Sequence, residues 1–354
     1  MSEITAQLVK QLREMTDAGM MDCKKALVEV QGDLQKAVEY LREKGLSKAA
    51  KKADRVAAEG AISVKVASDF SQACMIEVNS ETDFVAKNDG FKDLVAKTSE
   101  LVFAHNISEV SALESLHIEN QSFDEYLKTQ IAKIGENIVV RKTCNIKANQ
   151  GTIVNGYVHS NGRVGVIIAL KGSQANASKL AELARNLCMH AAAMKPVYID
   201  YSGFSAEFLE KERVAMIAEV EKENEELKRL GKPLKNVPKY ISRAQLTQSV
   251  LAEQEQILKD ELKKQGKPEA IWDKIIPGQL ERFIADNTLI DQRLTLLGQF
   301  FVMDDKKTIA QVLAEKSKEW NDTIEVAEYV RFELGEGIEK KAEDFAAEVA
   351  AQMQ

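Results

Sequence analysis

The residue types that most often carry chemistry show no catalytic spacing in this chain of 354 residues. Its four histidines and four cysteines lie far apart, without the paired spacing of a zinc site or a Cys-x-x-Cys redox site. It has neither a phosphate-cradling Gly-x-x-x-x-Gly-Lys-Ser/Thr loop nor a Gly-x-Gly-x-x-Gly turn. The sequence therefore favours a protein that is not an enzyme, with no catalytic residues, no metal and no cofactor.

One polar turn stands out because it places an acid beside an aromatic residue. A strand-like run over 73–78 precedes the turn, and a helix-like run from residue 91 follows it. Thr82 or Asp83 can cap a helix N-terminus here, with Phe84 packing at the helix entry. The alternative is that Thr82 holds the turn while Asp83 and Phe84 point outward to a partner. The chemistry of the turn alone leaves both interpretations open.

Composition and charge are those of a globular protein. The chain is 45% hydrophobic and 29% charged. A net charge of −7 argues against a polyanion-binding protein, so we expect no direct contact with nucleic acid. No run approaches the ~18 apolar residues of a membrane span, and the N-terminus lacks the pattern of a secretory signal. With its unpaired cysteines, the chain is expected to be cytoplasmic and without a membrane partner.

Residues 4–46 are predicted to form three short helices, the third ending at Gly45. A bundle of this size usually serves as a docking module. Met20 and Met21, in its first connection, either contact a partner or fill the bundle core. The basic run over 42–55 fits an Ala/Lys-rich solvated linker helix better than a nucleic-acid helix, because no aromatic residue interleaves it.

Beyond residue 60 the spacing of apolar residues changes from the helical period to the alternation of a strand. The same order of elements, a hairpin, helices and a third strand, then occurs twice. This pattern predicts an α+β fold with two related core halves and antiparallel sheets. The predicted domains are a bundle and linker, an N-terminal core half, a C-terminal core half, a helical insertion and a C-terminal helical module: 1–54, 55–150, 151–203 with 291–334, 204–290, and 335–354.

The insertion is expected to be almost wholly helical, because its apolar stripe is thin and its charge is high. It contains an internal repeat, in which 226–233 returns as 261–268. Each copy carries Gly followed two residues later by Pro, which is typical of a helix stop and reversal. A further reversal near Pro238–Ser242 would return the chain to the core and give a projecting up-down-up-down arm. The final amphipathic helix packs either on its own domain or in a partner's groove.

Several long motifs, in order, resemble those of bacterial elongation factor Ts, and the resemblance spans the chain except about 40 residues of the insertion. They are Met15-Thr16-Asp17-Ala18-Gly19-Met20-Met21-Asp22-Cys23-Lys24-Lys25-Ala26-Leu27, Thr82-Asp83-Phe84-Val85-Ala86-Lys87, Lys133-Ile134-Gly135-Glu136-Asn137, Gln299-Phe300-Phe301-Val302-Met303 and Arg331-Phe332-Glu333-Leu334-Gly335-Glu336-Gly337-Ile338-Glu339-Lys340.

The resemblance implies a translation elongation factor that exchanges guanine nucleotide on elongation factor Tu, binding it in both GDP-bound and nucleotide-free forms. It also implies a ubiquitin-associated-like N-terminal bundle, a two-part core, a coiled-coil projection and a C-terminal helical module. A homodimer is left open. The alternative, from another class, is a helical adaptor or scaffold without exchange activity.

The resemblance also implies the residues that bind the partner. Asp83 and Phe84, flanked by Thr82 and Val85, would enter the partner's G domain beside the nucleotide and magnesium site. The remaining positions would dock the bundle, the core and the C-terminal helix: Arg13, Met20, Met21, Lys24, Ile134, Gly135, His159, Ile338 and Phe345. At one position the chain departs from the family pattern, with Arg185-Asn186 where the family has a Lys-His pair.

Overall fold

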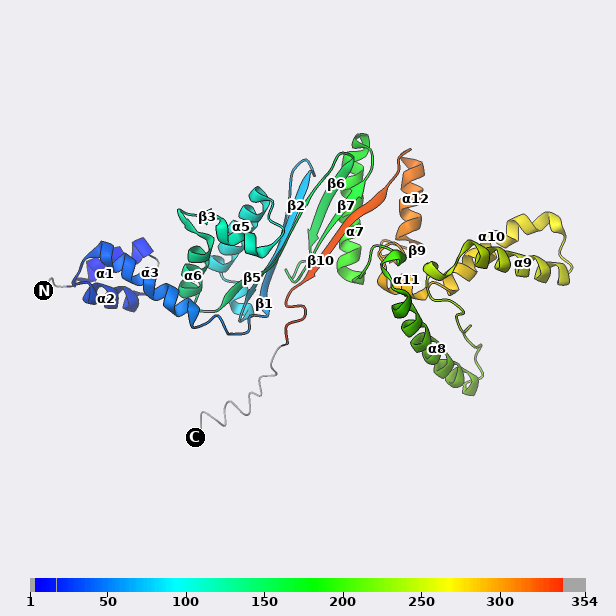
Figure 1. Ribbon diagram of the computed structural model, residues 1–354, viewed down its shortest axis with the longest axis horizontal. Coiled ribbons are helices and arrows are strands. Elements are labelled where there is room, and N and C mark those ends of the chain that lie inside the picture. The colour runs from blue at the N-terminus through cyan, green and yellow to red at the C-terminus, as the bar shows by residue number, and fades with distance from the viewer. Residues whose placement is uncertain (1–3, 17, 340–354) are drawn as a thin grey trace. The chain divides into compact units, whose positions relative to one another are not determined.

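The computed structural model describes residues 4–16 and 18–339, which form an α+β fold (Figure 1), as the sequence predicts. The chain divides into two compact units. The first holds the residues up to Leu170, the segment Ala177–Met189 and the residues from Val330 on. The second holds Lys171–Asn176 and His190–Tyr329. The predicted domain boundaries stay predictions, and the predicted C-terminal site residue Phe345 lies outside the described residues.

The N-terminal bundle consists of α1 (Ala6–Thr16), α2 (Met20–Glu29) and α3 (Leu34–Ala50). The Asp33 side chain caps α3 by accepting a hydrogen bond from the Lys36 amide at 3.1 Å. A small core of its own holds the bundle together, consisting of Val9, Leu12, Cys23, Ala26, Leu27 and Ala37.

The prediction that the third helix ends at Gly45 is wrong, because α3 continues to Ala50. Gly45 instead lies where α3 passes α6 (Phe123–Ile134), as Figure 1 shows. A Cβ atom at Gly45 would come within 3.3 Å of Ala132 Cβ, so the glycine lets the two helices approach closely. An ion pair of 2.5 Å between Arg42 and Glu125 joins the same two helices.

The first sheet has the order β1-β2-β5 and is antiparallel. Its strands are β1 (Glu59–Val66), β2 (Gln72–Ser80) and β5 (Ile138–Lys147). One face packs on α5 (Asp89–His105) and α6 through a core that includes Ile76, Phe91 and Tyr126. Short elements link these helices: η1 (Val110–Ser115), β3 (His117–Ile118) and β4 (Gln121–Ser122). Because β2 is central, it is buried from Ala73 to Ser80.

The second sheet has the order β10-β7-β6, from β6 (Thr152–Val158), β7 (Val164–Lys171) and β10 (Glu325–Glu333). Met75 of the first sheet and Ile167 of the second share one apolar cluster. Beyond β10, the Gly335 amide donates to the buried Glu77 carboxylate at 2.9 Å, and Arg141 donates to the same carboxylate at 3.0 Å. This contact fixes the segment that leads to Ile338.

The remaining elements complete the two units. In chain order they are η2 (Gln174–Asn176), α7 (Ala177–Met194), η3 (Tyr201–Gly203), α8 (Ala206–Arg229), η4 (Arg243–Gln245), α9 (Gln248–Lys264), η5 (Glu269–Ile271), α10 (Trp272–Asp286), α11 (Leu289–Leu294), β8 (Phe300–Phe301), β9 (Asp304–Thr308) and α12 (Ile309–Glu319).

Within the insertion, both copies of the repeat end a helix in the same way. The Lys232 amide donates to Leu227 O at 3.0 Å, and the Lys267 amide donates to Leu262 O at 3.1 Å. The glycine before each lysine has a positive φ, as a Schellman stop requires. The predicted helix stops are therefore confirmed in both copies.

The leg that follows α8 is extended rather than helical, which corrects the expectation of an almost wholly helical insertion. Side chains pair with some of its backbone groups. Asn224 on α8 pairs with the backbone of Lys235, and Asn287 accepts from the amides of Lys239 and Tyr240. Ile241 is then buried in an apolar cluster with Leu209, Met216 and Ile290. The chain thus reverses near Pro238–Ser242, as expected, and α9 and α10 form a separate helical pair (Figure 1).

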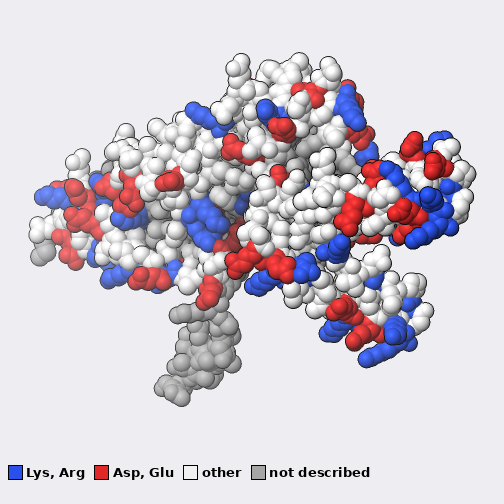
Figure 2. Space-filling view, turned by 45° about the vertical axis from the view of Figure 1, so that its right-hand side comes forward, with Lys and Arg blue, Asp and Glu red and all other residues white. Residues whose placement is uncertain are grey.

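Charges of both signs are interspersed over the face of the molecule in Figure 2. Lys and Arg side chains lie beside Asp and Glu side chains, with no broad field of one sign on that face. Among the helices that the structure describes, none is long and apolar enough to cross a membrane.

Candidate docking site at the Thr82–Val85 turn

The turn after β2 forms a one-turn helix, α4 (Asp83–Ala86), between two caps. Thr82 is the N-cap, with extended backbone, and its Oγ1 accepts a hydrogen bond from the Val85 amide at 3.4 Å. Asn88 caps the next helix, α5, by accepting from the Gly90 amide at 2.8 Å. The helix-cap interpretation of this turn is therefore confirmed.

Phe84 points away from the protein, and its side chain is the most exposed large apolar one in the described chain, at 78%. Its neighbours Val85 and Ala86 are half-buried against the core of the first sheet. The interpretation in which Phe84 packs at the helix entry is therefore wrong. An apolar ring held in water on an ordered turn is typical of a contact that a partner completes.

Asp83 is also exposed, and Lys87 is its immediate partner. The Lys87 ammonium donates to Asp83 Oδ2 at 2.7 Å and lies 5.9 Å from the centre of the Phe84 ring. The hydrogen bond from Lys87 holds the pKa of the Asp83 carboxyl below its ordinary value, so this group is charged at neutral pH. The turn therefore presents a carboxylate, an ammonium and a phenyl ring together.

At this turn, hydrogen bonds join residues 81–82 to residues 136–137, and each segment accepts from the other. Glu136 accepts from the Thr82 amide at 2.9 Å and from the Thr82 hydroxyl at 2.6 Å. Glu81 accepts from the Asn137 amide at 2.6 Å. The Asn137 side chain then donates to the carbonyls of Ala53 and Arg55, in the link between the bundle and β1.

Glu81 and Glu136 are site residues that the sequence reasoning misses. The available signal is the family segment Lys133-Ile134-Gly135-Glu136-Asn137. Its last two residues are polar, so their presence in the segment cannot be explained by packing in an apolar core. The structure places the predicted residues Ile134 and Gly135 just before Glu136, at the end of α6, where Gly135 has φ +93° and ends the helix. It therefore brings Thr82–Val85 and Ile134–Gly135 together through one carboxylate.

The predicted contact residues of the bundle all lie on its surface. Arg13 and Lys24 are exposed, and Met20 and Met21 are 60% and 64% exposed at the start of α2. The alternative that both methionines fill the bundle core is therefore wrong. Met20 and Met21 instead add flexible apolar surface of the kind that suits a docking face.

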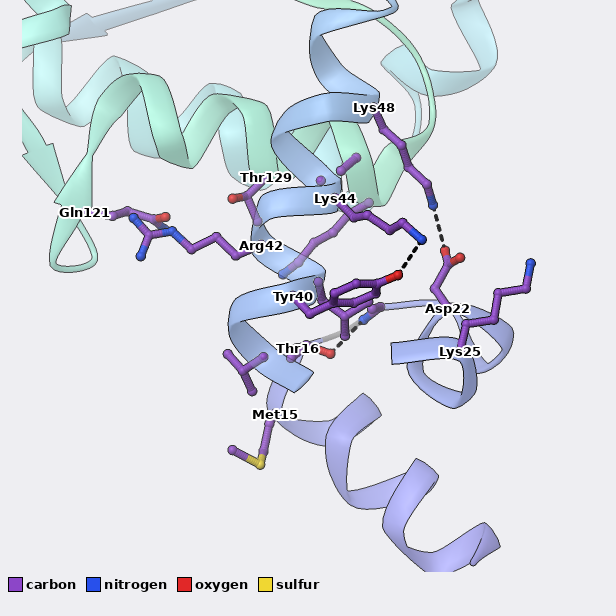
Figure 3. Close-up of a pocket in the computed structure, with 17 residues that line it drawn as sticks. Met15, Thr16, Asp22, Lys25, Tyr40, Arg42, Lys44, Lys48, Gln121 and Thr129 are labelled. Atoms are coloured by element: carbon purple, nitrogen blue, oxygen red, sulfur yellow. Dashed lines mark hydrogen bonds and ion pairs between the residues drawn. The ribbon is translucent and has the colours of Figure 1, made fainter. Parts of the chain in front are cut away.

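A pocket of about 460 Å³ lies between this bundle and α6 (Figure 3). The cationic side chains Lys48 and Lys44 in it are engaged, the first with Asp22 at 2.9 Å and the second with the Tyr40 hydroxyl at 2.6 Å. The pocket contains no histidine or cysteine, and in the described chain no group of His, Cys, Asp and Glu side chains could hold a metal ion. Both of these bonds lie within the bundle, and the Arg42–Glu125 ion pair is the contact that joins α3 to α6.

The other predicted site residues are dispersed over the first unit. His159 is exposed in the turn between β6 and β7, with the Tyr157 hydroxyl 3.3 Å from its Nδ1. Arg185, at the position that departs from the family pattern, lies over the Tyr157 ring at 5.9 Å. Ile338 is half-buried after the Glu77 contact.

The second unit has an apolar surface that lies outside the site residues predicted from the sequence. Phe300, Val302 and Met303, in the β8–β9 hairpin, are 41%, 46% and 49% exposed. Phe301 between them is buried beside His190, so the available signal is an apolar run of residues longer than a single buried position requires.

The fold and this turn present exposed side chains from several elements, an arrangement typical of the class of docking proteins. Comparisons give the family. The Elongation factor TS family model matches residues 81–239 and 234–336. The elongation factors Ts of Wolinella succinogenes, Helicobacter hepaticus and Helicobacter pylori strain 26695 are 71%, 69% and 66% identical to the chain, each over the full length of both sequences. The chain belongs to the elongation factor Ts family and is a translation elongation factor.

Proposed function

We propose that this protein is a guanine-nucleotide exchange factor that binds elongation factor Tu in its GDP-bound and nucleotide-free forms and promotes GDP release, so that GTP can bind. Asp83 and Phe84 enter the partner beside its nucleotide and magnesium site. The observation that carries the proposal is Phe84 itself, 78% exposed on a turn with capped ends. Family membership supports the identity of the partner.

An exchange factor of this kind is not an enzyme in the covalent sense and needs no cofactor. It acts by binding the nucleotide-free partner more tightly than the nucleotide-bound one, so that binding energy replaces chemistry. The absence of a catalytic spacing in the sequence is compatible with this mode of action. The protein works in the cytoplasm, without a membrane or nucleic acid.

The energetics require more than one contact. Weakening nucleotide binding by ~10⁴-fold takes about 5.5 kcal/mol of differential binding. Burying one Phe side chain contributes about 1.5–3 kcal/mol. Asp83, the exposed methionines of α2 and the β8–β9 hairpin are the available sources of the remainder.

The direct test is Phe84→Ala, followed by release of labelled GDP from elongation factor Tu in a stopped-flow instrument. We expect release at saturating factor to slow by about tenfold to a hundredfold, since the loss of one buried Phe contact costs about 1.5–3 kcal/mol, while part of the complex affinity remains. Val214→Ala, which truncates a 57% exposed apolar side chain on α8, is the matched control and should leave release unchanged. Unchanged release with Phe84→Ala would refute the role of Phe84. A stable complex indifferent to added GDP would instead support an adaptor.

A further inference from the structure

The Glu136 carboxylate makes two hydrogen bonds to a single residue, the N-cap of α4. One carboxylate oxygen accepts from the Thr82 amide at 2.9 Å, and the other accepts from the Thr82 hydroxyl at 2.6 Å. Glu136 reaches this position because Gly135, with φ +93°, ends α6 and turns the chain toward β2. Both bonds go to a charged acceptor, and such bonds are the stronger kind.

The bond to the hydroxyl also settles how Thr82 caps the helix. A hydroxyl group has one proton to donate and two lone pairs with which to accept. Because that proton is directed to Glu136, the lone pairs of Thr82 Oγ1 are left for the Val85 amide, 3.4 Å away. Glu136 therefore orients the cap as well as holding the Thr82 backbone.

Neighbouring bonds hold Glu136 itself in place. Asn137 donates its amide to Glu81 at 2.6 Å, and its side chain donates to Arg55 O at 2.8 Å. Within the turn itself, the Ser80 hydroxyl donates to Thr82 O at 3.0 Å. The carboxylate is thus presented to Thr82 by a scaffold that includes the end of α6 and the link to the bundle.

We propose that Glu136 is a positioning residue for the Asp83–Phe84 turn, acting through Thr82, and that it preorganises Phe84 for entry into the partner; the inference rests on the proposed function of Phe84. A helix of four residues has almost no stability of its own, because nucleation of a helix is unfavourable. Its geometry is therefore set by its cap. Molecules whose turn is already in the capped form can insert Phe84 directly. Molecules with a disordered turn must first order the turn, which weakens their apparent binding.

The first experiment needs no partner and uses hydrogen exchange in the free full-length protein. Glu136→Gln removes the charge and leaves one oxygen to accept where the carboxylate offers two. We expect the amides of Thr82 and Val85 to lose about tenfold of their protection, with the protection of β2 unchanged. Glu119→Gln, at a carboxylate paired with Lys97 on the surface, is the matched control and should change neither amide. Unchanged protection of both amides in Glu136→Gln would overturn the proposal.

The second experiment is a double-mutant cycle on GDP release by elongation factor Tu. Glu136→Gln should slow release at saturating factor by about tenfold while weakening complex affinity less, because fewer molecules carry an ordered turn. In a Phe84→Ala background, the same substitution should change release by less than about twofold, because residues that act through one contact are not additive. Thr82→Val, which removes the hydroxyl and keeps the amide, should behave like Glu136→Gln.

Two results would count against the inference in different ways. Full additivity of Glu136→Gln with Phe84→Ala would show that Glu136 acts elsewhere than through this turn, and would overturn the proposal. If Phe84→Ala left release unchanged, the proposed function of Phe84 would fail. The hydrogen-exchange experiment would still decide, in the free protein, whether Glu136 holds the turn.

Discussion

His190 is a buried histidine, and the hydrogen bonds of its two ring nitrogens fix one neutral tautomer. The Val302 amide donates to Nδ1 at 3.3 Å, so Nδ1 carries a lone pair and Nε2 carries the proton, which it donates to Gln299 at 3.0 Å. Gln299 is oriented in turn by the carbonyls of Met194 and Arg293. Burial lowers the pKa of His190, although the bond to Gln299 opposes the shift.

This arrangement predicts a loss of stability in mild acid. In the unfolded chain His190 binds a proton as the pH falls through its ordinary value of 6.5, whereas the folded protein resists protonation. The unfolded state then holds more protons, so the free energy of unfolding should fall by up to about 1.4 kcal/mol per pH unit below 6.5, until the lowered folded pKa is reached.

Urea unfolding between pH 7.5 and 5.5 measures this effect. His190→Gln should remove most of it, because glutamine can still accept from the Val302 amide and does not titrate. His117→Gln, at an exposed histidine in β3, should keep the dependence of the original chain. An equal loss of stability in His190→Gln and in the original chain would contradict the prediction.

At the scale of elements, the glycines that end α8 and α9 differ from a glycine in the interior of α10. Gly231 and Gly266 have φ of +65° and +69°, with open space where a Cβ atom would stand, so backbone conformation alone disfavours other residues there. Gly278 lies within α10 and also has open space around it, but its backbone is helical. Since all three glycines have room for a Cβ atom, substitutions at them differ in backbone strain alone.

Alanine should act in opposite directions at these positions. Gly231→Ala and Gly266→Ala should each destabilise the insertion by about 1–2 kcal/mol, because alanine is disfavoured at positive φ. Gly278→Ala should stabilise α10 by about 0.5–1 kcal/mol, because glycine is a poor residue in a helix interior. Hydrogen exchange of the α8, α9 and α10 amides gives both signs in one experiment, and a stabilising Gly231→Ala would refute the role of the stop.

The elements differ in how well the sequence predicts them, for physical reasons. Alternating apolar residues predict β1, the apolar run over 73–78 predicts β2, and Gly followed two residues later by Pro predicts both helix stops, because these signals are local. At Gly45, α3 packs closely against Ala132, and the non-helical leg after α8 is held by Asn287, so both features involve distant residues. The bond between Glu136 and Thr82 joins residues 54 positions apart, which no local pattern reports.

At the scale of the whole molecule, the candidate contacts are spread over both units. The first unit carries Phe84 and the exposed methionines of α2, and the second carries the apolar β8–β9 hairpin. Several separate surfaces suit a factor that must dissociate again. Each surface contributes only part of the binding free energy, so no single contact makes the complex irreversible. Under the proposed function, nucleotide binding must offset the summed binding free energy of these surfaces before the factor dissociates.

The proposed exchange function predicts a reciprocity that can be measured at equilibrium. The four binding steps that link free partner, nucleotide, factor and their ternary complex form a closed cycle. If saturating factor lowers the affinity of elongation factor Tu for GDP by ~10⁴-fold, saturating GDP must lower its affinity for the factor by the same ratio, about 5.5 kcal/mol. Calorimetric titrations of each ligand, with and without the other, give the two ratios independently.

Phe84→Ala should reduce both ratios by one common factor, because the ring contributes to the coupling between the two ligands and not to either one alone. Val214→Ala should leave both as in the original chain. A variant that weakened binding of the factor equally with and without GDP would have lost a plain docking contact. If Phe84→Ala behaved in that way, the ring would be an anchor on the partner, and the displacement of nucleotide would have to come from another element.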